Sequence, residues 1–252
     1  MADPVITYES KDNIATITIN RPEKMNALSN QLVVELRDAF QRLQDSDDRA
    51  CVLTAAGDKA FSVGADLKDP PRDPNLWECM PGVGVMLDKP VVAAVHGYCV
   101  GGAFCLVEFS DIAVADETAD FFYPEAQIGF CGGLIAGLAA RITHKHAMEF
   151  MLTGVHYKAQ RAYEVGMVNK VTPKGEHLAA AYEYARILAD SAPLVVRALK
   201  RFTRDVVTAR GPSELSALAQ RELLAISRSE DQQEGGRAFR AGLAAIQSTP
   251  PP

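Results

Sequence analysis

The sequence predicts an α/β fold in which short buried strands alternate with helices and a helical region closes the chain. Short apolar stretches bounded by Gly, Pro, Asn or Asp recur along the first part of the sequence, which is typical of buried strands. Between them, apolar residues spaced three and four apart indicate amphipathic helices. From about Ala192 onward only helical spacing remains.

The first elements are expected to be two strands and a helix. Val5 to Tyr8 forms one strand and Ile14 to Ile19 the next, in which alternate apolar side chains share one face. A helix follows, with Ser29 or Asn30 as its N-cap. Its apolar positions have helical spacing: Leu32, Leu36, Ala39, Phe40 and Leu43. Ala50 to Thr54 is the next strand.

The middle of the chain has the order strand, helix, strand that is typical of βαβ units. Pro90 to Val95 is a buried strand, Gly102 to Phe109 a helix, and Asp111 to Ala115 a second strand. Phe121 to Tyr123 forms a further short strand. The pattern then becomes mostly helical, with one more strand near Val168 to Val171.

The last quarter of the chain is expected to be entirely helical. Pro193 suits the first turn of a helix, and the pairs Gly211-Pro212 and Gly235-Gly236 are expected to interrupt the helices that follow. The proline-rich segment 69–74 predicts a surface loop, and 248–252 a disordered tail. We therefore divide the chain into a core, residues 1–191, and a C-terminal helical region, residues 192–252.

The composition excludes several classes of protein. The chain has 252 residues, a formal net charge of -6 and 48% hydrophobic residues, which favours a globular protein without a basic surface for nucleic acid. The five cysteines show no CxxC spacing, which favours a reducing compartment. With no signal-like start and no apolar segment long enough for a bilayer, we expect a cytoplasmic protein without membrane association.

The most informative segment runs from His96 to Phe104, where a buried strand turns through glycines into a helix. Such a turn leaves free backbone N–H groups at the start of the helix, where they and the helix dipole favour negative charge. The segment Phe61 to Leu67 contains a second glycine turn that can supply another donor. Together the two turns predict a site for an oxyanion.

Several segments, in this order along the chain, carry a resemblance to a known family. They are 20–28 (NRPEKMNAL), 61–67 (FSVGADL), 89–97 (KPVVAAVHG) with Gly101-Gly102, and 123–129 (YPEAQIG). The chain resembles the crotonase (enoyl-CoA hydratase/isomerase) superfamily over nearly its whole length. The resemblance implies a spiral of ββα units followed by C-terminal helices that serve in oligomerisation or capping. It also implies a homotrimer or hexamer that acts on acyl-CoA thioesters, as in fatty acid metabolism.

The resemblance implies a role for each part of the catalytic site. The backbone N–H groups of Ala65 and Gly102 would hold the thioester oxygen, with Gly101 allowing the close approach. Removing or adding a proton beside a thioester builds enolate charge on that oxygen, which two preorganised donors stabilise. Glu125 matches a glutamate that hydratases of the family use as general acid and base. Apolar neighbours around it predict a raised pKa.

Cys105 stands where hydratases of the family have their second glutamate. A buried thiol does not accept a proton as a carboxylate does, so we expect either a single-glutamate double-bond isomerase or a hydratase in which Glu108 or an ordered water replaces the missing group. Other enolate reactions stay open, namely decarboxylation, dehydration and thioester hydrolysis. An acyl-CoA-binding protein with little catalytic activity is the alternative outside enzymes.

The family's coenzyme A site matches two segments of this chain. Lys24, Met25 and Ala27 lie on one side of that site, and Asp66, Leu67 and Lys68 lie on the other. Phe130 precedes a Cys-Gly-Gly sequence that departs from the family pattern and is expected to shape the substrate pocket, together with Cys105. We expect no cofactor other than the coenzyme A of the substrate. We also expect no metal, because the His144-x-His146 pair has no accompanying carboxylate cluster.

Overall fold

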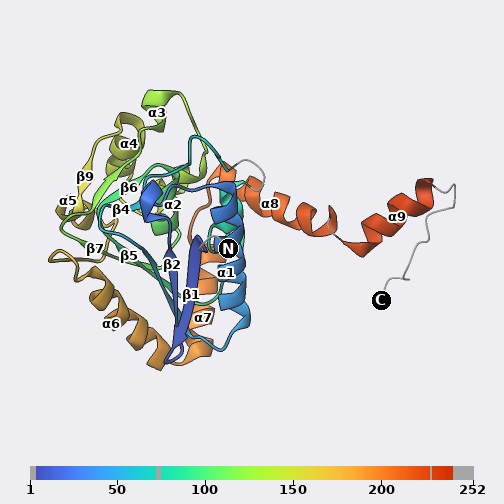
Figure 1. Ribbon diagram of the computed structural model, residues 1–252, viewed down its shortest axis with the longest axis horizontal. Helices are drawn as coiled ribbons and strands as arrows, with labels where there is room; N and C mark the ends of the chain where they lie inside the picture. The colour runs from blue at the N-terminus through green and yellow to red at the C-terminus, as the bar shows by residue number, and fades with distance from the viewer. Residues whose placement is uncertain (1–3, 72–74, 228, 241–252) are drawn as a thin grey trace.

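The computed structural model describes residues 4–71, 75–227 and 229–240, which form two β-sheets surrounded by helices (Figure 1). The strands are β1 (Ile6–Lys11), β2 (Ile14–Ile19), β3 (Ala50–Ala55), β4 (Ala60–Ser62), β5 (Val91–Val95), β6 (Tyr98–Val100), β7 (Ile112–Asp116), β8 (Asp120–Phe122), β9 (Tyr157–Lys158) and β10 (Lys170–Thr172). The helices are α1 (Asn30–Asp45), α2 (Gly102–Glu108), α3 (Glu125–Ile128), α4 (His144–Thr153), α5 (Ala159–Glu164), α6 (His177–Asp190), α7 (Pro193–Phe202), α8 (Pro212–Ser227) and α9 (Glu230–Arg240). Short turns of helix occur at η1 (Pro22–Lys24), η2 (Leu76–Cys79), η3 (Leu134–Ala140) and η4 (Thr203–Val207).

From β3 to β8, consecutive strands alternate between the two sheets. The larger sheet has the order β1-β2-β3-β5-β7-β10, with β1 antiparallel to β2 and the other neighbours parallel. The smaller sheet has the order β4-β6-β8-β9, in which only the β8–β9 pair is antiparallel. Each of β5 and β7 is followed by a strand of the smaller sheet and then by a helix. This repetition is the spiral of ββα units, and it confirms the predicted fold class.

The strands of the larger sheet agree with the sequence prediction to within a few residues. Three strands of the smaller sheet, β4, β6 and β9, were not predicted; they have only two or three residues each. An alternation of apolar and polar residues cannot be recognised over so short a length. These strands bring the two glycine turns together, because β4 and β6 are parallel neighbours.

Both faces of the larger sheet are covered. Helix α6 lies along one face with four buried alanines, which pack against strand residues such as Val52, Val92 and Val114. Helix α1 begins with Ser29 as N-cap, whose side chain accepts a hydrogen bond from Leu32 N at 3.3 Å. The apolar positions predicted for this helix are buried in the main core. The core therefore holds β5 and α2 rigidly on either side of the glycine turn.

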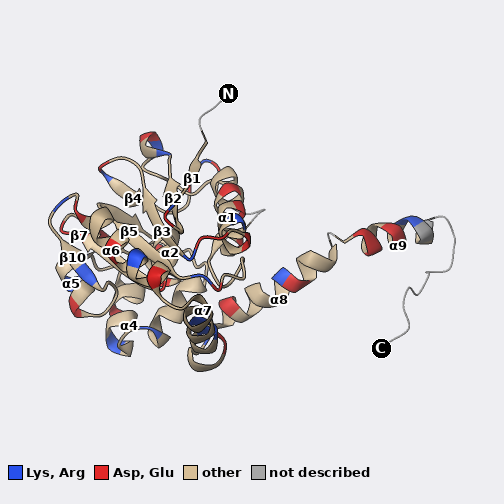
Figure 2. Cartoon of the chain, turned by 90° about the horizontal axis from the view of Figure 1, so that it is seen from below, with Lys and Arg blue, Asp and Glu red and all other residues tan. Residues whose placement is uncertain are grey.

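The C-terminal arm, formed by α8 and α9, extends away from the sheets (Figure 1). It exposes Leu215, Leu223, Ile226 and Phe239, and both acidic and basic residues lie along it (Figure 2). The prediction that Gly235-Gly236 interrupts the helices was wrong, since α9 continues through both residues. Pro193 does begin α7. The predicted tail 248–252 and part of the predicted loop 69–74 lie outside the described residues.

None of the helices in the described part of the chain combines the length and the apolar character that crossing a bilayer requires. The division into a core and a C-terminal oligomerisation or capping region stays a prediction.

Candidate active site

The first glycine turn is held by the N-terminal segment that follows β2. Leu28 N donates to Gly64 O at 2.8 Å, and Asp66 N donates to Leu28 O at 2.9 Å. These two bonds form a parallel bridge between Leu28 and Ala65. The bridge places two predicted site segments, Lys24 to Ala27 and Ala65 to Lys68, side by side.

This pairing determines where the Ala65 N–H points. The N–H belongs to the peptide group whose carbonyl oxygen is Gly64 O, and that oxygen is directed at Leu28. The C=O and N–H of a trans peptide point in opposite directions, so the Ala65 N–H is directed away from Leu28. It donates to no other described residue. Ala65 therefore offers an unused donor, as an oxyanion site requires.

The second glycine turn lies directly against the first. A Cβ built on Gly64 would lie 2.8 Å from Val100 O and 3.7 Å from Gly102 N. Gly102 is the first residue of α2, so its N–H is one of the amides that the helix itself leaves unbonded. The structure thus brings together the backbone of Ala65 and Gly102, the two donors predicted from the sequence.

Glu125 is the first residue of α3, and its side chain is turned back onto the second glycine turn. A Cβ on Gly101 would lie 2.4 Å from Glu125 Oε1, and Gly101 has φ +57°, so only glycine fits here without strain. Glu125 is 6% exposed, and Oε2 has no hydrogen-bond partner among the described residues.

The surroundings of Glu125 adjust its proton affinity. Burial raises the pKa of Glu125 to about 7, against the opposing influence of its own backbone amide and that of Gly102. A carboxyl group with a pKa near neutrality is suited to both accepting and releasing a proton. The carboxyl and the Gly102 amide therefore face the same space, which fits a base beside an oxyanion donor.

Cys105 is buried on α2, one turn from Gly102, and is 3% exposed. Burial and the nearby charges of Glu108 and Glu125 raise the pKa of its thiol well above the ordinary value. The thiol is thus held in its neutral form, which is neither a base nor a nucleophile. Tyr123 is a neighbour that sequence reasoning missed. It is buried, and burial together with the charge of Glu125 raises the pKa of its phenol.

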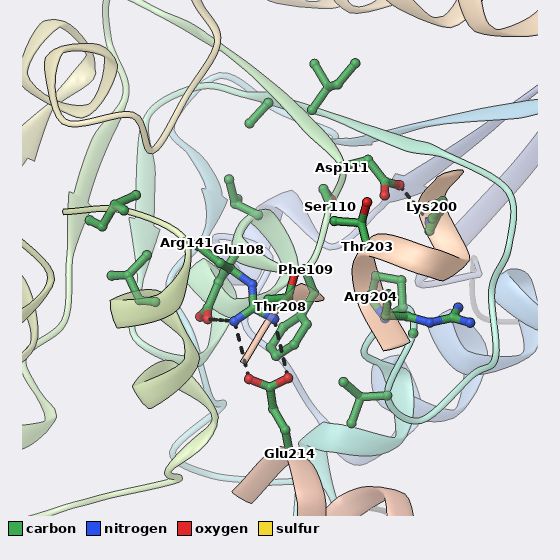
Figure 3. Close-up of a pocket in the computed structure, with 18 of the residues that line it drawn as sticks. Glu108, Phe109, Ser110, Asp111, Arg141, Lys200, Thr203, Arg204, Thr208 and Glu214 are labelled. Atoms are coloured by element: carbon green, nitrogen blue, oxygen red, sulfur yellow. Dashed lines mark hydrogen bonds and ion pairs between the residues drawn. The ribbon is translucent and has the colours of Figure 1, made fainter. Parts of the chain in front are cut away.

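Glu108 is turned towards a different cluster (Figure 3). Its Oε1 lies 3.1 Å from Arg141 Nη1, and the same nitrogen lies 3.3 Å from Glu214 Oε1 on α8. These three residues line a cavity of about 470 Å³ between α2, η3 and the C-terminal helices, and among the described residues Glu125 does not line it. Burial raises the pKa of Glu108 well above its ordinary range, with Arg141 opposing this. The structure therefore does not pair Glu108 with Glu125.

The remaining predicted binding residues lie at the edge of the site. Lys24, Leu67 and Lys68 are exposed, and Leu67 is 90% exposed. Phe130 is also exposed, while Ala27 is buried. Within the described residues neither lysine forms an ion pair with an acid.

Two further predicted binding residues, Met25 and Asp66, are not exposed at the edge of the site. Met25 lines a small cavity of about 160 Å³ between η1 and the turn before β4. The carboxylate of Asp66 is occupied within the protein. It accepts from Arg21 Nη1 at 2.6 Å and from Lys68 N at 2.9 Å. Arg21 was part of the recognised motif but was given no role, because its partner lies 45 residues away in the sequence.

The chain matches known proteins over most of its length. Residues 9–243 match the family profile described as Enoyl-CoA hydratase/isomerase. The chain is 32% identical to an (E)-benzylidenesuccinyl-CoA hydratase of Thauera aromatica over 93% of this chain and 95% of that protein. It is 33% identical to a carnitinyl-CoA dehydratase of Salmonella typhi over 90% of this chain and 91% of that protein.

Solved structures give the same result for the fold. A carnitinyl-CoA hydratase from Mycobacterium avium has a TM-score of 0.78 and 32% identity, and the match covers 98% of this chain and 99% of that one. A putative short chain enoyl-CoA hydratase from Novosphingobium aromaticivorans has a TM-score of 0.73 and 32% identity, with 97% of each chain covered.

Proposed function

The chain belongs to the enoyl-CoA hydratase/isomerase (crotonase) family, whose members act on CoA thioesters, and from this premise we propose that it transfers a proton at the α-carbon of an acyl-CoA through an enolate. The observation that carries the proposal is the buried Glu125 carboxyl packed on the Gly101-Gly102 turn, beside the unused Ala65 N–H.

The proposed mechanism uses two backbone donors and one base. The thioester oxygen accepts hydrogen bonds from the N–H groups of Ala65 and Gly102, which stabilise the negative charge as it forms. One such donor is worth about 2.7–4 kcal/mol of barrier. The ionised Glu125 removes the α-proton, the electron pair of the C–H bond forms the carbon–carbon double bond of the enolate, and the π electrons of the C=O bond move to the thioester oxygen. Return of that proton to the γ-carbon of a 3-enoyl thioester gives the 2-enoyl isomer.

A single carboxylate at the site favours double-bond isomerisation as the reaction. Cys105 holds its proton, and Glu108 is engaged with Arg141. Moving one proton between two carbons requires only one base, whereas hydration also requires a group that orients and deprotonates water.

Addition or loss of water is the second candidate, and the names of the relatives favour it. The compared proteins are a benzylidenesuccinyl-CoA hydratase and carnitinyl-CoA dehydratases or hydratases. In this reaction an ordered water held by backbone or by Tyr123 would attack the β-carbon and give up a proton to the ionised Glu125. Glu125 would then deliver a proton to the α-carbon of the enolate, and loss of water would follow the reverse path.

The coenzyme A portion is proposed to lie across the paired segments that carry Lys24 and Lys68. Their ammonium groups, which form no ion pair with an acid among the described residues, would meet its phosphates, although the chain as a whole is acidic. Lys24→Ala and Lys68→Ala should each raise KM several-fold and leave kcat unchanged. A fall in kcat without a change in KM would contradict this role.

Incubation with 2-enoyl- and 3-enoyl-CoA thioesters in D2O, followed by mass spectrometry, tests the proposal. Interconversion of the isomers, or deuterium uptake at the α-carbon of the 3-enoyl thioester, supports the one-base reaction, and a gain of the mass of D2O supports hydration. Glu125→Gln should abolish either product. No turnover together with micromolar binding would refute the enzymatic proposal and favour an acyl-CoA-binding protein. Loss of CO2 or release of free coenzyme A would identify a different enolate reaction or hydrolysis.

A further inference from the structure

One guanidinium group joins the two segments that position the Ala65 donor. Arg21 Nη1 donates to Ala27 O at 3.0 Å and to Asp66 Oδ2 at 2.6 Å. Ala27 precedes Leu28, and Asp66 follows Ala65, so the guanidinium joins both chains at the Leu28–Ala65 bridge. The side chains of Arg21 and Asp66 are only 19% and 13% exposed. Such shielding strengthens a charged hydrogen bond relative to one at an open surface.

The backbone of Arg21 is also held in place by a hydrogen bond to the side chain of Asn26. Arg21 N donates to Asn26 Oδ1 at 2.9 Å, and Asn26 Nδ2 donates to Ala56 O and Ala60 O at 2.9 and 2.8 Å. Asn26 is 1% exposed and has φ +56°, a left-handed conformation that asparagine tolerates better than most residues. The turn that carries Arg21 is therefore anchored to the loop before β4.

Both carboxylate oxygens of Asp66 accept hydrogen bonds from within the protein. One oxygen accepts from Arg21, and the other accepts from Lys68 N at 2.9 Å. The hydrogen bonds from Arg21 and from the backbone of Lys68 lower the pKa of Asp66, so the carboxylate stays ionised at neutral pH.

We propose that Arg21 and Asp66 are positioning residues for the oxyanion donor of Ala65. This inference rests on the proposed function. The clamp they form with Ala27 O holds the Leu28–Ala65 bridge in register, and the bridge aims the Ala65 N–H. Neither side chain touches the substrate. Their effect is to fix the direction of a hydrogen bond that matters most when charge develops on the thioester oxygen.

The expected effect of breaking the clamp is a loss of turnover rather than of binding. A donor lost outright costs about 10²–10³ in kcat, and a misplacement of about 1 Å can cost about 10²-fold. Arg21→Met should lower kcat with a 2-enoyl- or 3-enoyl-CoA about 10- to 100-fold, with KM changed less than about threefold. Asp66→Asn should have the same effect on kcat and KM. The double variant should lose no more than the stronger single variant, because the two residues act as one unit.

Lys200→Met is a matched control, because Lys200 makes the same kind of contact elsewhere. Its Nζ donates to Lys89 O and to Asp111 Oδ2, both at 2.7 Å, just before β5 and β7 begin. That is the end of β5 opposite the glycine turn. Lys200→Met should lower the melting temperature comparably to Arg21→Met while kcat stays within about twofold.

Two readouts separate positioning from general destabilisation. The C=O stretching frequency of a bound 2-enoyl-CoA falls when the oxygen accepts strong hydrogen bonds. This fall should be smaller in Arg21→Met than in wild type and Lys200→Met. In the free protein, the amides of Leu28 and Asp66 should exchange with D2O faster in Arg21→Met than in Lys200→Met.

The exchange experiment needs no substrate, so it stands even if the proposed function fails. If wild type neither binds nor converts these thioesters, the proposed function is overturned while faster exchange still supports the clamp. Unchanged exchange of Leu28 and Asp66 would overturn the clamp. If the enzyme is active, the clamp would also be overturned by a kcat within twofold of wild type in both Arg21→Met and Asp66→Asn. A change in KM without a change in kcat would overturn it as well.

Discussion

Replacing Glu125 by glutamine should change how stability depends on pH, because it removes a carboxyl that burial keeps protonated. The folded protein holds the pKa of Glu125 at about 7, against an ordinary value of 4.5. The folded state therefore binds this proton more tightly than the unfolded chain. Stability from Glu125 is complete below about pH 4.5 and is lost as the pH rises to about 7.

The size of the effect follows from the two pKa values. One pKa unit corresponds to 1.36 kcal/mol, so ionising Glu125 costs the folded protein up to about 3 kcal/mol. Most of this cost arises between pH 5 and 8. Glutamine has the same shape and no charge, so the Glu125→Gln variant does not lose stability through this ionisation. Relative to wild type, the variant should gain about 2–3 kcal/mol between these two pH values.

Urea unfolding at fixed protein concentration measures this gain. Free energies of unfolding of wild type and Glu125→Gln are compared at pH 5 and pH 8, and only the pH-dependent part of their difference is used. Burying an amide adds a constant cost that cancels. Glu9→Gln, on an exposed position of β1, is the control and should shift by less than about 0.5 kcal/mol.

The activity of wild type should follow the same ionisation. When Glu125 acts as the base, kcat/KM rises with pH and levels off above about pH 7. If the difference in the free energy of unfolding between wild type and Glu125→Gln is the same at pH 5 and pH 8, the reasoning is refuted. It would mean that the carboxyl is not perturbed by its burial against Gly101.

Substitutions at three other positions test the packing around the site. Gly101→Ala places a methyl 2.4 Å from Glu125 Oε1 and should lower kcat at least about 100-fold. Gly166→Ala is the control: Gly166 has φ +84° and nothing within 4 Å of an added Cβ, so this variant should leave kcat unchanged while introducing a similar backbone strain. Arg141→Met leaves two buried carboxylates without a cation and should cost about 3–5 kcal/mol in urea unfolding; a loss below about 1 kcal/mol would contradict this. Cys105→Ser should keep kcat within about threefold, and a thousandfold loss would make the thiol a catalytic group.

The sequence was sufficient for the fold class and for the parts of the site that lie in continuous segments. Buried strands such as β5 and the helix α2 have periodicities that depend on local burial alone. The glycines between them were recognised as well, although the short strand β6 that lies between these glycines was not. Glu125 was predicted to have a raised pKa because its apolar neighbours are also neighbours in the sequence, and its burial accords with that.

The sequence was insufficient where a residue's partner lies far along the chain. Glu108 was left as one candidate for the missing carboxylate, and its spacing on α2 could not show that Arg141 and Glu214 draw it to another cluster. Asp66 was predicted to lie at the substrate site, and the sequence could not show that its carboxylate accepts a hydrogen bond from Arg21. The strands β4 and β6 are too short to show a period.

The sequence by itself determined the α/β class, the two glycine turns and the choice of Glu125 as the acid beside the second turn, because these depend on interactions between residues close in the chain. Only the tertiary structure decided the direction of the Ala65 N–H, the contact between Gly101 and Glu125, and the partners of Glu108 and Asp66. Each of these depends on two segments that meet through the sheets. Hydrogen bonds have strict limits of distance and angle, so such contacts become defined only when the whole core has packed.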